Sequence, residues 1–106
     1  LIARLLSVEE QDLFATVGKE KQVDYLSKRY AAKEAIAKAF GTGIGEAFSF
    51  QDATIFNHQS GRPDVALSAR GDALLRSLAD AKKGKIQLSL SDERDYAVAF
   101  AVISLV

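Results

Sequence analysis

The sequence contains no cysteine, and that absence removes three kinds of chemistry at once. Disulfide bonds, thiolate metal sites and cysteine nucleophiles all need the thiol group. Without a disulfide, a chain of 106 residues must be stabilised by its own core, by a ligand or by partner subunits. Histidine is nearly absent as well, because His58 is the only one, and a zinc site is therefore not expected.

An excess of charge of either sign is also missing, because 14 Lys and Arg residues balance 14 Asp and Glu residues. This balance argues against a broad basic field, and we expect no nucleic-acid partner. No apolar run is long enough to cross a bilayer, and the first residues show no secretory signal pattern. We therefore expect a cytoplasmic protein without a membrane partner, with a single domain over residues 1–106.

The pattern that is present predicts helices first and antiparallel strands later, which is an α+β fold. Ser7 followed by Glu10 is a capping-box pattern that begins a short helix. A long helix is predicted over residues 21–40, because Gly41 stands where a C-terminal glycine belongs. Its apolar stripe is predicted to consist of Leu26, Tyr30, Ala37 and Phe40, supported by Val23 and Ile36.

The strands are predicted in the second half of the sequence. They are expected over residues 53–56, 65–67, 86–90 and 96–106, with a third helix over 71–81. The only proline, Pro63, lies in the turn between the first two strands. The last two strands are expected to form a hairpin around a solvated, charged turn that includes Asp92. We expect the long helix to pack on this small antiparallel sheet.

The long helix also carries most of the residues that could do chemistry. Its cations are Lys28, Arg29, Lys33 and Lys38. The helix leads into a glycine-rich loop, residues 41–45, and cations beside backbone amides suit a polyphosphate. Glu34 would be the anion in such a site, as expected for a Mg²⁺ ligand. Spacing alone favours a second interpretation, in which Glu34 and Lys38, four residues apart, form a surface ion pair.

Other familiar motifs do not fit the sequence. The glycine-rich loop follows a helix and lacks the Gly-Lys-Ser/Thr ending of a P-loop, so taken alone it indicates a helix cap and a turn. His58 lies in a polar turn without a partner at catalytic spacing, and we interpret it as exposed. No serine is surrounded by a nucleophile-elbow pattern.

Four blocks of sequence occur in a specific order. They are RYAAKEAIAKAFGTGIG at 29–45, FSFQD at 48–52, SGRP at 60–63 and LSLSDERDYAVA at 88–99. Together they resemble the signature of the holo-acyl-carrier-protein synthases, the small bacterial 4′-phosphopantetheinyl transferases. The hallmark of that family is a Lys-Glu-Ala core followed by a second Lys and a Gly-Thr-Gly loop. The resemblance covers the chain from Arg4 onward.

The resemblance implies an α+β 4′-phosphopantetheinyl transferase fold and an enzymatic function. Such enzymes transfer the phosphopantetheine arm of coenzyme A to a serine of apo-acyl carrier protein, releasing 3′,5′-ADP. The reaction depends on Mg²⁺ and serves fatty-acid biosynthesis. Glu34 matches the family's metal-binding glutamate, which also helps to deprotonate the serine, and Lys38 matches the lysine that contacts the phosphates. The implied nucleotide and coenzyme A contacts are Arg29, Lys38, Gly41, Thr42, Gly43 and Pro63.

The sequence departs from the family pattern at two places. The family opens with a strand carrying Gly-Thr-Asp, whose Asp is the second protein ligand of Mg²⁺. No such segment precedes Leu1, and we expect that the sequence as written omits it. The departure keeps an alternative open, a non-catalytic coenzyme A or nucleotide-binding or assembly module of the same fold. Asp92 stands where many relatives have His, and its role is left open.

The resemblance also implies partners. The family forms homotrimers with active sites between neighbouring subunits, and a small chain gains core by association. Acyl carrier proteins are acidic, so a basic docking patch is expected, and Arg4 is the candidate within this sequence.

Overall fold

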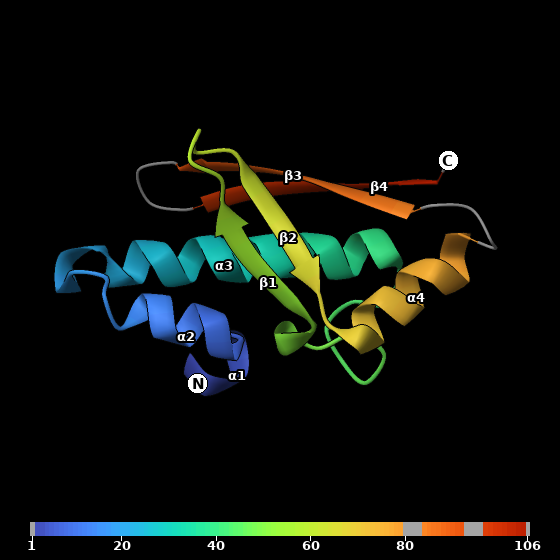
Figure 1. Ribbon diagram of the computed structural model, residues 1–106, viewed down its shortest axis with the longest axis horizontal. Helices are drawn as coiled ribbons and strands as arrows, with labels where there is room; N and C mark the ends of the chain where they lie inside the picture. The colour runs from blue at the N-terminus through green and yellow to red at the C-terminus, as the bar shows by residue number, and fades with distance from the viewer. Residues whose placement is uncertain (1, 80–83, 93–96, 106) are drawn as a thin grey trace.

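The computed structural model describes residues 2–79, 84–92 and 97–105 and shows a mixed arrangement of helices and hairpins (Figure 1). In chain order the elements are α1 (Ile2–Leu5), α2 (Val8–Phe14), α3 (Lys19–Phe40), the 3₁₀ turn η1 (Phe50–Asp52), β1 (Ala53–Asn57), β2 (Pro63–Leu67), α4 (Ala69–Ala79), β3 (Gly84–Asp92) and β4 (Ala97–Leu105). This order confirms the predicted α+β fold. Within the described residues, no helix is both long and apolar enough to cross a membrane.

Capping residues determine where the helices begin and end. Ser7 caps α2, and the reciprocal bonds of the capping box with Glu10 are both present. Gly41 ends α3 in the left-handed conformation with φ of 84°, and its amide donates to carbonyls of the last helical turn. The long helix begins at Lys19, two residues before the predicted start, because Gly18 serves as its N-cap.

Two antiparallel hairpins enclose α3. Figure 1 shows the β1–β2 hairpin crossing α3, and β3 and β4 running along its length. In the first hairpin Ile55 pairs with Val65, and in the second Leu88 pairs with Ala101. β3 extends to Asp92, so the first part of the predicted charged turn belongs to a strand. The rest of that turn, residues 93–96, lies outside the described residues.

The core consists of two clusters that share α3. The larger one joins α3 to both hairpins and α4, and its buried members are Ala32, Ile36, Ala37, Phe40, Phe48, Ala53, Ile55 and Leu75. The smaller one joins the start of α3 to the N-terminal helices and consists of Leu5, Leu6 and Tyr25. The long helix is therefore the element that holds every other part of the described chain in place.

The predicted apolar stripe of α3 is partly wrong. Ile36, Ala37 and Phe40 are buried as expected, but Val23 and Tyr30 are exposed. The buried face is lined by Tyr25, Arg29, Ala32, Lys33, Ile36, Ala37 and Phe40. Two cations therefore occupy core positions, and apolar periodicity could not identify the face because it assigns every cation to solvent.

Candidate functional site

Glu34 and Lys38 lie on α3 without bonding to each other. Glu34 is half-buried, Lys38 is exposed, and the ion pairs of the described residues include none between them. The predicted surface ion pair is therefore absent, and both groups can face a ligand. The Tyr30 hydroxyl lies beside Glu34, and hydrogen bonding and charge from that carboxylate raise the pKa of Tyr30.

The glycine-rich loop uses its amides internally. The amide of Gly41 donates to Lys38 O at 2.9 Å, and those of Thr42 and Gly43 both donate to Ala37 O, at 3.2 and 3.1 Å. This corrects the expectation that these amides face a polyphosphate, because the last carbonyls of α3 need donors and take them. Gly41 and Gly43 have positive φ, and a Cβ at either would meet nothing within 4 Å. The loop therefore offers open space in which a ligand can approach the backbone.

Asp52 anchors the far end of this loop. Its carboxylate accepts hydrogen bonds from the Ser49 amide at 2.8 Å and the Ser68 hydroxyl at 2.9 Å, and pairs with Arg70 at 3.2 Å. Arg70 also donates to the carbonyl of Glu46, the residue that follows the loop. Burial alone would raise the pKa of Asp52, but the bonds from Ser49 and Ser68 and the Arg70 charge outweigh it and lower that pKa.

Lys33 is buried, contrary to its predicted place in a cationic surface. Its side chain is 0% exposed and pairs at 2.5 Å with the carboxylate of Glu10, which is 1% exposed. Its Nζ also donates to Leu5 O at 2.7 Å and to Phe50 O at 2.8 Å. Burial lowers the pKa of Lys33, Glu10 opposes that shift, and the nearby Arg29 adds to it.

Arg29 is also buried, with an exposed fraction of 5%. Its guanidinium carbon lies 3.9 Å from the centre of the Tyr25 ring, and Nη2 reaches Ile55 O only at 3.5 Å. Its Nε has no hydrogen-bond partner among the described residues. With Lys33 and Glu10 beside it, the described residues of this interior include two cations and one anion, and none of them supplies a second anion for Arg29.

The tip of the β1–β2 hairpin holds a pair that the sequence analysis missed, and Pro63, which was predicted in the turn, is the first residue of β2 and pairs with Asn57. His58 Nε2 lies 2.8 Å from Asp64 Oδ2, so the interpretation of His58 as lacking a partner is wrong. The bond to His58 is the main reason why the pKa of Asp64 is lowered. The signal was available, because Asp64 pairs with Phe56 across the hairpin and so lies close to His58. Pro63 begins β2 beside this pair.

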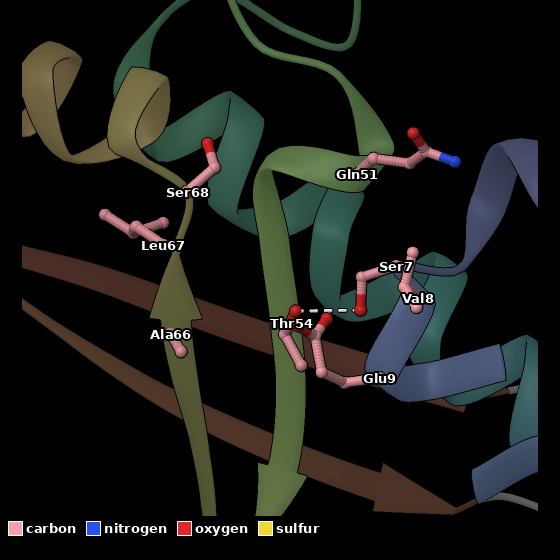
Figure 2. Close-up of a pocket in the computed structure, with 8 residues that line it drawn as sticks. All are labelled: Ser7, Val8, Glu9, Gln51, Thr54, Ala66, Leu67 and Ser68. Carbon is pink, nitrogen blue, oxygen red and sulfur yellow. Dashed lines mark hydrogen bonds between the residues drawn. The ribbon is translucent and has the colours of Figure 1, made fainter. Parts of the chain in front are cut away.

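Two of the grooves in the described surface lie beside the N-terminal helices. A cavity of about 430 Å³ lies between the start of α2 and the β1–β2 hairpin, where Thr54 donates to Ser7 at 2.8 Å (Figure 2). Its lining includes none of the predicted site residues. A second groove of about 480 Å³ is lined by Arg4, Ile44, Gly45, Glu46, Ser49, Phe50 and Gln51. It joins α1 to the glycine-rich loop, and its Phe50 ring lies 5.6 Å from the Tyr30 ring, next to Glu34.

No ready-made metal cluster accompanies Glu34. Within the described ranges, no group of three or more His, Cys, Asp or Glu side chains could hold a metal ion. Asp52, which follows the glycine-rich loop, is already engaged by Ser49, Ser68 and Arg70. A metal at Glu34 would therefore need further ligands from a substrate, from water or from another carboxylate.

Comparison with known proteins gives a consistent result. Residues 1–101 match the family model described as the 4′-phosphopantetheinyl transferase superfamily. The holo-[acyl-carrier-protein] synthase of Ruthia magnifica is 45% identical over 102 residues, which are 96% of this chain and 76% of that protein. The synthase of Shewanella amazonensis is 44% identical over 103 residues, 97% of this chain and 78% of that protein.

Solved structures show the same similarity in three dimensions. The holo-[acyl-carrier-protein] synthase of Neisseria meningitidis matches with a TM-score of 0.86 and 39% identity, over 97% of this chain and 78% of that one. The synthase of Bacillus anthracis, solved in complex with coenzyme A (3′,5′-ADP), matches with a TM-score of 0.81 and 28% identity. The match covers 99% of this chain and 80% of that one. The match thus spans nearly all of this chain.

Proposed function

The chain belongs to the 4′-phosphopantetheinyl transferase superfamily, and we propose that it transfers the 4′-phosphopantetheine arm of coenzyme A to a serine of apo-acyl carrier protein. The other product is 3′,5′-ADP. The observation that carries this function is the similarity to holo-[acyl-carrier-protein] synthases along nearly the whole chain. The relatives solved with coenzyme A or 3′,5′-ADP support the identity of the donor. None of these relatives is named as a non-catalytic module.

Lys38 is the side chain best placed to meet the phosphates. Transfer of a phosphoryl group needs mainly positioning and neutralisation of charge, rather than covalent chemistry by the protein. Lys38 is exposed in the last turn of α3 and forms no ion pair with any described residue. Its charge is therefore available to the pyrophosphate, next to the open space at Gly41 and Gly43.

Glu34 is the residue that would hold Mg²⁺. Mg²⁺ keeps several waters and is usually bound by one or two carboxylates together with substrate phosphates, so a single carboxylate fits this ion. When bound, the ion would neutralise charge on the pyrophosphate. Glu34 would also accept the proton of the carrier serine, directly or through water.

Arg29 and the β1–β2 turn would face the nucleotide half of coenzyme A. The support for Arg29 is its unpaired Nε and the excess positive charge of its surroundings, since a buried cation is stable only with an anionic partner. A phosphate group or a carboxylate of another chain would supply that partner. Pro63 and Thr42 complete the proposed coenzyme A contacts.

The surface suggests how the subunits and the carrier would meet. On β4, Phe100 and Val102 are 70% and 55% exposed, while the alternate residues Ala101 and Ile103 pack against the core. An apolar outer face of this kind is suited to association, and we propose that it lies within a homotrimer. Arg4, exposed on α1, is the proposed contact for the acidic carrier. The cytoplasmic location stays a prediction.

Replacement of Glu34 tests the proposed function. We expect Glu34→Gln to lose Mg²⁺-dependent transfer and to melt at the wild-type temperature, because Gln keeps the size of the side chain and can still accept a hydrogen bond from the Tyr30 hydroxyl. Glu20→Gln, an exposed change in the first turn of the same helix, serves as the matched control and should transfer normally. The intact mass of the carrier protein is the readout. Transfer by Glu34→Gln at the wild-type rate would overturn the assignment.

A further inference from the structure

The Lys33–Glu10 pair connects four separate parts of the chain. An ammonium group has three N–H donors, and in Lys33 they reach Glu10 of α2, the Leu5 carbonyl at the end of α1 and the Phe50 carbonyl of η1. The second carboxylate oxygen of Glu10 accepts the Ile55 amide of β1 at 2.8 Å. Every donor of Lys33 is therefore used, and its three bonds start from the residue that precedes Glu34, while the Ile55 amide is held by Glu10.

Stability alone is a poor explanation for this pair. Two charges lose their hydration when they are buried, and well-packed apolar residues of similar volume often give a fold that is equally or more stable. The pair instead fixes geometry, because an ion pair with directed hydrogen bonds allows only one arrangement of the elements that it joins. An apolar contact would allow the same elements to slide against each other.

The elements joined by Lys33 are the two walls of the second groove. Leu5 follows Arg4, which lines the groove on the α1 side, and Phe50 lines it on the η1 side. Phe50 in turn lies against Tyr30, beside Glu34. The two carbonyl bonds of Lys33 thus fix the distance between the two walls from the buried side, while the Gln51 side chain bonds to the Ala3 and Leu6 carbonyls nearer the surface.

We propose that Glu10 and Lys33 are positioning residues that hold the α1–α2 segment at a fixed distance from Glu34, so that a carrier protein bound at Arg4 presents its serine correctly. This inference rests on the proposed function. Of the proposed coenzyme A contacts, Lys38 and the glycine-rich loop lie at the C-terminal end of α3 and Pro63 begins β2. Arg29 lies beside the pair but forms no hydrogen bond with either member among the described residues. Carrier use should therefore depend on the pair more strongly than use of coenzyme A does.

Glu10→Gln is the most informative variant, because it removes the negative charge but keeps a hydrogen-bond acceptor and the size of the side chain. Lys33→Met and the double variant Glu10→Gln, Lys33→Met complete a cycle. The matched control is Arg76→Gln, which removes the exposed ion pair with Asp72 on α4. We expect the KM for carrier protein to rise about tenfold or more in Glu10→Gln, with the KM for coenzyme A changed less than about twofold. The control should change neither constant.

Amide hydrogen exchange supplies a readout that does not need activity. In Glu10→Gln, amides of residues 5–14 should exchange about tenfold faster while those of the β3–β4 hairpin keep their wild-type rates. Parallel rises in both KM values, or uniformly faster exchange, would show that the pair is only structural and overturn the proposal. So would an unchanged carrier KM, or failure of Glu10→Gln to fold. A wild-type chain without transfer activity would refute the proposed function instead, and the exchange experiment would still test the pair.

Discussion

At the scale of single residues, the surroundings of each charge decide what it can do. Lys33 and Lys38 lie on the same helix, yet Lys33 has three internal partners while Lys38 is exposed and forms no ion pair with a described residue. A buried, fully bonded cation positions its neighbours, whereas an exposed cation is available to a ligand. The proposed chemistry therefore assigns contact with the pyrophosphate to Lys38 and not to Lys33.

Lys38→Ala should weaken transfer without affecting the fold. Loss of one preorganised charge contact typically costs about 3 kcal/mol of transition-state stabilisation, so kcat/KM should fall by about two orders of magnitude. Steady-state kinetics with carrier protein and coenzyme A measure this directly. Lys21→Ala, an exposed change on the same helix, is the control. An unchanged kcat/KM in Lys38→Ala would place this lysine outside the site.

Asp52 should make stability depend on pH. Its pKa is lower in the folded chain than in the unfolded chain, so the carboxylate stabilises the fold at neutral pH and loses that effect as the pH falls through the folded pKa. Asp52→Asn should lower the free energy of unfolding by about 1–3 kcal/mol at pH 7. The difference from wild type should shrink below about pH 4.

Urea titrations at both pH values measure this effect, with Asp12→Asn as an exposed control. A difference between wild type and Asp52→Asn that is equal at pH 7 and at low pH would contradict the assignment. The anchor that Asp52 provides for the glycine-rich loop would then not depend on its charge.

At the scale of elements, the local sequence was sufficient to predict where helices begin and end. It was not sufficient to predict which face of a helix is buried. Ser7, Glu10 and Gly41 act through bonds to nearby backbone, so the sequence around them predicts their geometry. The buried face of α3 depends instead on Glu10, Leu5 and Phe50 meeting Lys33 from distant parts of the chain. Such tertiary bonds leave no periodic signal, which is why the cation was assigned to the surface.

A side chain at Gly41 should destabilise the fold only through the backbone conformation of this residue. Its φ of 84° is unfavourable for other residues, and a Cβ there would meet no atom within 4 Å. We expect Gly41→Ala to cost about 1–2 kcal/mol in the free energy of unfolding. Gly45→Ala is the matched control, because that glycine also has open space but no positive φ, and it should cost far less. Equal urea midpoints for the two variants would refute this explanation.

At the scale of the whole molecule, the sequence predicted the α+β fold and the family, while the arrangement of the site came only from the structure. The motif correctly identified α3 and its loop, and the cap formed by the loop was predicted as well, but the motif could not show that Arg29 and Lys33 are buried. Those features depend on packing between elements far apart in the sequence. The outer face of β4 is likewise a property of the folded hairpin.

Phe100→Lys should disrupt self-association. A charge in the apolar outer face of β4 would be buried without a partner in any assembly that covers this face. Sedimentation should show wild-type trimers and Phe100→Lys monomers, with loss of transfer if the sites lie between subunits. Val23→Lys, at another exposed apolar residue, should remain trimeric. A monomeric wild-type protein would contradict the proposed assembly.

The most direct test of the central claim is the intact mass of an apo-acyl carrier protein after incubation with this protein, coenzyme A and Mg²⁺. The account predicts a gain of one phosphopantetheine group per carrier, which is lost when EDTA removes the metal or when Glu34 is replaced by Gln. A synthase already known to modify the same carrier serves as the positive control. If that control modifies the carrier and this protein leaves its mass unchanged, the proposed transfer is contradicted.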